Sequence, residues 1–207
     1  MKDERLLIFA NFYIDSEERF DRLKNSFESF RDIEAKFSIN IRGRYRFKVK
    51  EYLKHFISEQ NIYFKDSPKG WFFDSHEITK NINCDYVFIW VEDHICVNKK
   101  LFKEVLKDIF KSQIDVLTYS WWQGGRLFKA FNKYGLNREN NISWFIQDKH
   151  NNLEKIYLIG LQSIIKKSLF QKILINNGSQ NRWNKKLPFD FEKKNTDLEW
   201  LPLKRGI

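Results

Sequence analysis

The sequence predicts an α/β fold with a Rossmann-like, mostly parallel central sheet flanked by helices and a C-terminal antiparallel hairpin. Three observations lead to this prediction. Apolar runs of strand length alternate with amphipathic stretches of helix length, about every 30 residues, through the first 120 residues. Polar side chains follow the apolar runs directly, where ligands bind in open α/β sheets. After residue 140 two strand-like runs lie close together, which favours a hairpin.

The first part of the chain alternates between strands and helices. The run 5–14 is apolar except for Arg5 and Asn11, as expected of a strand buried on both faces. Helix 15–30 follows, and Asp15 with Glu18 predicts a capping-box start. Further strands are expected at 35–43, 61–66, 86–91 and 114–122, and further helices at 46–59, 71–82 and 98–113.

The later part of the chain departs from this alternation. The runs 142–148 and 154–162, joined by KHNN, predict the two strands of the hairpin. Residues 163–176 have the pattern of a helix, and residues 177–207 predict an irregular C-terminal tail. The pattern shows no repeat and no linker, so we expect one domain over residues 1–207.

The composition is that of a folded basic protein, with 42% hydrophobic residues, 17% aromatic residues and a formal net charge of +10. Such a charge favours an anionic partner, although AT-rich coding explains an excess of lysine equally well. No apolar run reaches the length of a membrane span. Two cysteines, Cys84 and Cys96, fit a reducing compartment. We therefore expect a cytoplasmic protein and, as a further expectation, peripheral contact with the inner face of the membrane.

Two acids and an imidazole end the apolar run in DYVFIWVEDH, residues 85–94. Glu92, Asp93 and His94, here called the EDH motif, are all residue types that bind divalent ions. Adjacent carboxylates repel one another unless a cation or a proton separates them. The motif therefore favours a metal site, and an acidic strand end that caps the next helix is the alternative.

This strand end and the order of elements over residues 5–175 resemble the nucleotide-sugar glycosyltransferases of the GT-A fold, in particular family-2-like enzymes. In that family a strand of this type ends in a DXD motif, for which this chain has the EDH form. The resemblance implies Mn²⁺ or Mg²⁺ held by Glu92, Asp93 and His94. It also implies a nucleoside-diphosphate sugar as donor, with Asp93 near the nucleotide. Glu in the first place and His in the third leave the need for a metal open.

The resemblance also implies a nucleotide subsite at the ends of the first two strands. Asn11 and Tyr13 correspond to the loop after the first strand, which lies near the base or ribose in the family. Arg42, at the end of the second strand, corresponds to a position that faces a phosphate or the base.

Acceptor-side residues are expected late in the chain. An inverting transferase needs a general base, and among four late acids we favour Asp190, which Pro188 and two Phe residues flank. An ordinary surface acid is the alternative. Trp121 and Trp122 are expected to stack on a sugar ring, or else to form part of the core.

Asp74-Ser75-His76 matches an Asp-X-His variant of the motif that one branch of the family uses, but it precedes a predicted helix rather than following a strand. We expect Asp74 or Ser75 to be the N-cap of that helix.

The function predicted from the resemblance is sugar transfer to a hydroxyl of a glycan acceptor, by a hexosyltransferase of polysaccharide biosynthesis. A nucleic-acid-binding module fits the charge and the aromatic residues, but lysines are spread along every helix, so nucleic acid is the less favoured partner. A nucleotidyltransferase would have a Gly-rich loop after the first strand, which ANFYIDSEE lacks. A GT-A-like domain that binds without catalysis stays open, as does the oligomeric state.

Overall fold

The computed structural model describes residues 5–119, 137–148, 161, 163–175 and 201–206. Within these residues a sheet has the strand order β3-β2-β1-β4-β8-β5-β9-β7-β6. The strands are β1 (Leu6–Tyr13), β2 (Lys36–Arg42), β3 (Ile62–Tyr63), β4 (Tyr86–Ile89), β5 (Val116–Thr118), β6 (Asn137–Glu139), β7 (Ile142–Gln147), β8 (Ser163–Lys166) and β9 (Leu203–Gly206). The helices are α1 (Glu17–Phe30), α2 (Arg46–Leu53), α3 (Trp71–Thr79), α4 (Lys99–Ser112) and α6 (Lys167–Ile175), with a 3₁₀ turn η1 (Glu59–Asn61).

Most strands of this sheet run in one direction. β2 and β4 are parallel to β1, and β3 is parallel to β2. β8 is antiparallel to both β4 and β5, so β5 runs in the same direction as β4. β9 is parallel to β5, and β7 is antiparallel to β9 and β6. Within the described residues only β8 and β7 are therefore reversed, and the predicted mostly parallel α/β fold is confirmed.

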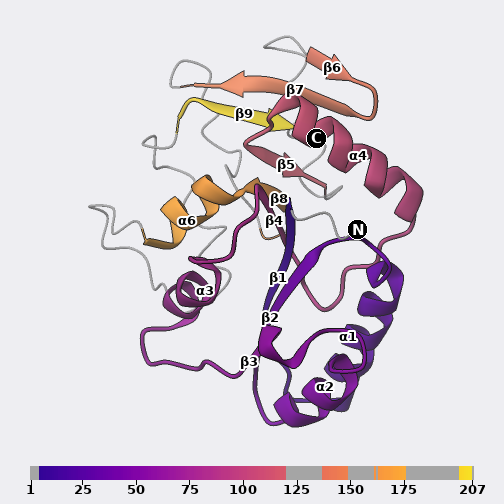
Figure 1. Ribbon diagram of the computed structural model, residues 1–207, viewed down its shortest axis with the longest axis vertical. Helices are drawn as coiled ribbons and strands as arrows, with labels where there is room; N and C mark the ends of the chain where they lie inside the picture. The colour runs from indigo at the N-terminus through magenta and orange to yellow at the C-terminus, as the bar shows by residue number, and fades with distance from the viewer. Residues whose placement is uncertain (1–4, 120–136, 149–160, 162, 176–200, 207) are drawn as a thin grey trace.

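Helices cover both faces of the sheet, with α1, α2 and α4 on one side and α3 and α6 on the other (Figure 1). Along β1, Leu6, Ile8 and Ala10 belong to the core under α1 and α4, whereas Leu7 and Phe9 belong to the core under α3 and α6. All five are fully buried. This burial explains why the first apolar run has no polar alternation, since a strand covered on both faces needs apolar side chains throughout.

β8 corrects the prediction of a continuous helix over residues 163–176. Ser163–Lys166 is a strand between β4 and β5, and the helix α6 begins only at Lys167. Ile164 and Ile165 are β-branched and fit a buried strand. The prediction was a helix because these two residues extend the apolar spacing of α6 toward the N-terminus.

The first predicted strand of the hairpin is present as β7, but it forms a hairpin with β6 before it, with Asn140 and Asn141 as the connection. The range 154–162, expected as its second strand, lies outside the described residues except for Leu161. The turn is held on α4 by the Asp108 carboxylate, which accepts hydrogen bonds from the Asn141 N–H (2.9 Å) and side chain (2.9 Å) and from Asn140 (3.1 Å).

The chain end and the N-cap of α1 also differ from expectation. Leu203–Gly206 forms β9 between β5 and β7, so the predicted irregular tail ends in a strand. The N-cap of α1 is Ser16, which accepts a hydrogen bond from the Arg19 N–H, and not Asp15. No described helix combines the length and the apolar character that crossing a membrane requires.

Candidate functional site

The order of the strands reverses between β1 and β4. β2 and β3 lie on one side of β1, and the chain then returns to place β4 on the other side. In open α/β sheets, ligands bind beyond the carboxyl ends of the strands at such a switch point. Here this edge contains the residues that follow β1 and the EDH motif that follows β4.

Trp90 fixes the path of the chain from β4 into the EDH motif. Its ring packs edge-on against Phe12 (4.7 Å between centroids) and Phe30 (4.8 Å), and its Nε1–H donates to the Ser26 hydroxyl at 2.8 Å. The same hydroxyl donates to the backbone carbonyl of His94. The motif is therefore tied to α1 through a buried indole rather than suspended on an open loop.

The three side chains of the EDH motif do not converge. Asp93 Oδ1 lies 3.8 Å from His94 Nε2. Glu92 faces elsewhere, with Oε1 3.9 Å from an Arg19 guanidinium nitrogen. The described residues contain no group of three His, Cys, Asp or Glu side chains arranged to hold a metal ion. The arrangement thus leaves Asp93 and His94 as a pair and separates Glu92 from them.

Tyr119, directly after β5, orients the imidazole of His94. The tyrosine hydroxyl lies 3.1 Å from His94 Nδ1 and 3.4 Å from the carbonyl oxygen of Ile89. Burial of the hydroxyl end raises its pKa, and the charge of Asp93 raises that pKa further, so the phenol stays protonated. If it donates to Ile89, it accepts from His94 Nδ1–H, which makes Nε2, on the side of Asp93, the unprotonated nitrogen. Histidine metal ligands are commonly oriented by such a hydrogen bond through the other ring nitrogen.

Arg19 joins the two sides of the switch point. It lies in the first turn of α1, donates a hydrogen bond to the carbonyl oxygen of Tyr13 at 2.8 Å and lies 3.7 Å from the carboxylate of Asp15. Its contact with Glu92 reaches across to the other strand end. The sequence prediction missed Arg19. The sequence offered one signal for Arg19: it is a cation in the first turn of α1, directly after two acids. Anions bind at the N-terminal end of a helix, so a cation there favours an anionic ligand.

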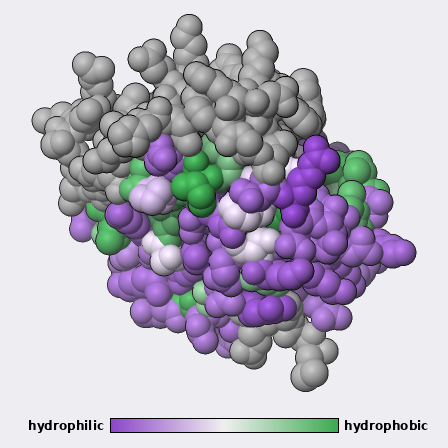
Figure 2. All heavy atoms as spheres, turned by 90° about the horizontal axis from the view of Figure 1, so that it is seen from above, coloured by the Kyte–Doolittle hydropathy of each residue, from purple (hydrophilic) through white to green (hydrophobic). Residues whose placement is uncertain are grey.

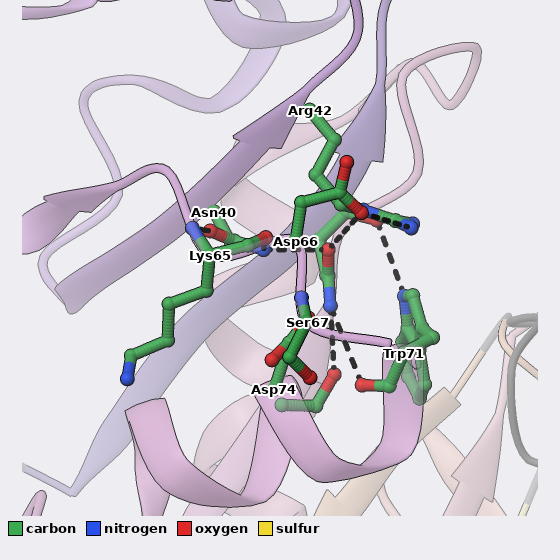
Figure 3. A network of polar contacts seen from close by, with 9 residues as sticks. Asn40, Arg42, Lys65, Asp66, Ser67, Trp71 and Asp74 are labelled. Carbon is green, nitrogen blue, oxygen red and sulfur yellow. Dashed lines mark hydrogen bonds and ion pairs between the residues drawn. The ribbon is translucent and has the colours of Figure 1, made fainter. Parts of the chain in front are cut away.

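Asn11 is the centre of a buried network at the ends of β1 and β2, and Figure 3 labels its partners Asn40, Arg42 and Trp71. Its amide nitrogen donates to Ser75 Oγ (3.0 Å) and to the carbonyl of Trp71 (3.4 Å). Its amide oxygen accepts from Asn40 (2.9 Å) and from Arg42 Nε (3.1 Å). Two donors and two lone pairs are all that an asparagine side chain offers. Asn11 therefore has no bonding capacity left for a nucleotide and instead positions its neighbours.

Arg42 is the residue that this network presents to the site. Besides Asn11, its guanidinium approaches Asp66 (3.7 Å), which follows β3 (Figure 3), and lies 6.0 Å from the ring centre of Tyr13. The Tyr13 side chain is 50% exposed, so one aromatic face and one cation stand together beyond the sheet edge. Asp66 was missed because it enters from a third strand.

The remaining predicted residues divide into two groups. Asp74 is buried within the first turn of α3 and accepts from the Ser67 N–H (3.0 Å), as Figure 3 shows. The N-cap of α3 is Gly70, so the predicted cap at Asp74 or Ser75 was wrong. Three predicted site residues lie outside the described part of the chain: Asp190, Trp121 and Trp122.

Comparisons with known proteins agree on the fold. No family model and no curated protein matches the sequence. The crystal structure of residues 1–349 of TarS from S. aureus, a glycosyltransferase, superposes with a TM-score of 0.50 at 13% identity. The superposed part is 82% of this chain and 48% of the TarS chain, so this chain spans about half the length of TarS 1–349.

Two further TarS structures are similar at lower scores. TarS 1–349 in complex with UDP gives a TM-score of 0.46 at 12% identity, and TarS itself gives 0.48 at 13%. Both matches include 82% of this chain. They include 47% of the chain in the UDP complex and 29% of the TarS chain. Only the TM-score of 0.50 carries an argument, and at 13% identity it shows the fold alone.

Proposed function

We propose that this protein is a glycosyltransferase that moves a sugar from a nucleoside-diphosphate donor to a hydroxyl of a glycan acceptor. The observation that carries the proposal is the arrangement at the switch point. Arg19, the Asp93–His94 pair and the Arg42–Tyr13 pair stand beyond the carboxyl ends of neighbouring strands. Cations, an aromatic face and a candidate metal site together suit a nucleoside diphosphate.

The donor nucleotide is proposed to bind across the ends of β1, β2 and β3. The exposed ring of Tyr13 offers a stacking surface for the base, and Asp66 offers an acceptor for its N–H groups. Arg42 contacts the base or a phosphate. Asn11 acts through Arg42, because every hydrogen-bond donor and acceptor of its side-chain amide already has a partner. Arg19, at the N-terminus of α1, faces the diphosphate.

Asp93 and His94 would hold Mn²⁺ or Mg²⁺ together with phosphate oxygens, a donor set in which one or two protein ligands suffice. When bound, the ion would stabilise the negative charge of the departing diphosphate. Glu92 is proposed to orient Arg19 instead of binding the metal. If Tyr119 donates to Ile89, Nε2 of His94 carries no proton, which suits this assignment.

The acceptor side of the proposal rests on the sequence. Asp190 is the proposed general base, and Trp121 and Trp122 are the proposed stacking surface for a sugar. A base that acts only in chemistry predicts that Asp190→Asn lowers kcat while the affinity for the nucleotide is kept. Glu192→Gln, close by in the sequence, is the control. Peripheral contact with the inner face of the membrane, in polysaccharide biosynthesis, is part of the same proposal.

Calorimetric titration of UDP and of GDP, with and without Mn²⁺, tests the site. We expect one nucleotide to bind in a Mn²⁺-dependent manner and Asp93→Ala and His94→Ala each to remove the dependence. Glu92→Gln should retain it. Asp21→Asn, an exposed carboxylate on α1, is the charge-matched control.

Absence of binding of either nucleotide, with or without metal, would contradict the proposed function. It would favour a nucleic-acid-binding module, which a filter-binding assay with single-stranded RNA and DNA would detect. Metal-dependent binding without transfer to any acceptor would identify a GT-A-like binding domain. Binding that is indifferent to both Mn²⁺ and Asp93 would keep the nucleotide site and overturn the role given to the pair.

A further inference from the structure

Three aliphatic side chains are exposed on the segment that leads from the EDH motif into α4. Ile95 is 57% exposed, Val97 95% and Leu101 44%. They border an apolar pocket of about 270 Å³, whose floor includes Phe88 and Phe102. Single exposed apolar residues are ordinary, but a contiguous group beside a pocket marks an interaction surface. In the view of Figure 2, hydrophobic groups appear at several places on an otherwise mostly hydrophilic surface.

A stripe of lysines runs beside these aliphatic residues. Lys100, Lys103 and Lys107 are exposed and recur at the spacing of one helix face on α4. None of the three forms a salt bridge with a residue that the structure describes, whereas Lys99 is paired with Asp32 at 2.8 Å. Residues 95–107 contain four lysines and a single acid, a glutamate.

We infer that this surface docks on an anionic lipid bilayer. It is called the α4 surface here and comprises Ile95, Val97, Leu101, Lys100, Lys103 and Lys107. Aliphatic side chains enter the interface of a bilayer while neighbouring lysines contact the headgroups, which is the combination of an interfacial amphipathic element. A second copy of the chain is a poorer partner, because two lysine stripes would face each other.

This inference deepens the proposed function, because the α4 surface adjoins the candidate catalytic edge. His94 contributes to the lining of the same pocket, together with Ile95 and Val97. A protein docked on this surface would hold its Asp93–His94 pair close to the headgroups. The implied acceptor class is a hydroxyl carried on a membrane-anchored molecule.

The expected strength of the docking follows from its parts. Each lysine near an anionic surface contributes roughly a fivefold gain in partitioning, so three contribute about a hundredfold. Insertion of Val97 adds about tenfold or more, because its side chain is almost wholly exposed to water before docking. The lysine share is screened by salt, and the aliphatic share is not.

Vesicle sedimentation tests the inference with the full chain. Wild type should bind vesicles of phosphatidylcholine with 30% phosphatidylglycerol and not vesicles of phosphatidylcholine alone. We expect Lys100→Gln/Lys103→Gln/Lys107→Gln to lose about a hundredfold in partitioning and Val97→Asp about tenfold. A matched lysine control is the triple substitution to Gln of Lys48, Lys50 and Lys54, which lie on or directly after α2 and pair with glutamates. Ile175→Asp on α6 is the apolar control.

Wild type that ignores anionic vesicles would overturn the inference, as would an equal loss in the α2 triple variant, which would show general charge attraction. Light scattering that detects a dimer abolished by Val97→Asp would replace the bilayer by a second copy. UDP titration of the same variants keeps the two proposals apart. A variant that loses vesicle binding but still binds UDP tests the α4 surface alone. A variant that still binds vesicles but loses UDP binding tests the proposed function alone.

Discussion

Asn11→Ala tests whether a buried amide holds the nucleotide subsite together. The substitution removes four polar contacts, with Ser75, Trp71, Asn40 and Arg42. Asn40 keeps its contacts with the backbone of the chain after β3, and the carbonyl of Trp71 belongs to a helix. The groups left without their partner are therefore Arg42 Nε and the hydroxyl of Ser75.

The magnitude follows from these two groups. A buried polar group that loses its partner costs about 1–3 kcal/mol, and the side chain of Asn11 is 8% exposed, so water replaces it poorly. We expect the free energy of unfolding to fall by about 2–4 kcal/mol, a large part of the total for a domain of this size. Urea unfolding followed by circular dichroism measures it. Asn25→Ala, an exposed asparagine on α1, should change it by less than about 0.5 kcal/mol.

The same variant separates a positioning role from a direct contact with the nucleotide. If Asn11 acts through Arg42, Asn11→Ala should weaken UDP binding in wild type but add little in an Arg42→Ala background. Additive losses in affinity would show that Asn11 contacts the ligand itself. A loss of stability below about 0.5 kcal/mol would refute the buried network as an energetic unit.

Three further predictions concern neighbouring features. Tyr119→Phe should weaken Mn²⁺-dependent UDP binding about 10–100-fold in calorimetry, because the imidazole of the motif loses its orienting partner; unchanged Mn²⁺ dependence would contradict this. Gly43→Ala should lower the free energy of unfolding by about 2 kcal/mol or more, since Gly43 has a φ of +88° and a Cβ would collide with the carbonyl of Ile14; near-neutral urea unfolding would contradict it. Burial tends to raise the pKa of Asp108, but hydrogen bonds from Asn141 and its neighbour outweigh burial and lower that pKa below 3.8. Its stabilisation is thus present above pH 3.8 and lost as the pH falls through the folded-state pKa. Asp108→Ala should therefore cost about 1–3 kcal/mol at pH 7, a difference that shrinks in acid unfolding below about pH 4.

The strand and helix alternation was predictable because each element carries its own periodicity. β1 lies buried on both faces and therefore reads as one apolar run, and α4 has its apolar residues on one side. β8 could not be predicted in the same way. Its four residues precede a helix without a break, and the open edges of β4 and β5, between which it pairs, exist only in the folded sheet.

The candidate site was predictable to the same degree. The EDH motif ends an apolar run, where ligands bind in open α/β sheets, whereas Tyr13 and Arg42 were predicted from the resemblance to the GT-A glycosyltransferases. Arg19 and Tyr119 come to the site from a helix and from a separate strand, which no local pattern encodes. The saturation of the Asn11 amide likewise depends on partners far away in the sequence.

The reversed strand β8 also determines how wide the site is. Because β8 is inserted between β4 and β5, the carboxyl ends of those two strands are separated by the beginning of β8 at Ser163. Tyr119 nevertheless spans this separation and reaches Ile89 on β4 at 3.4 Å. The Tyr119 hydroxyl therefore links the end of β5 to the Asp93–His94 pair across the inserted strand. We propose that the nucleotide lies at the ends of β1 and β2 and the transferred sugar at the end of β5, a division that transfer between a donor and an acceptor requires.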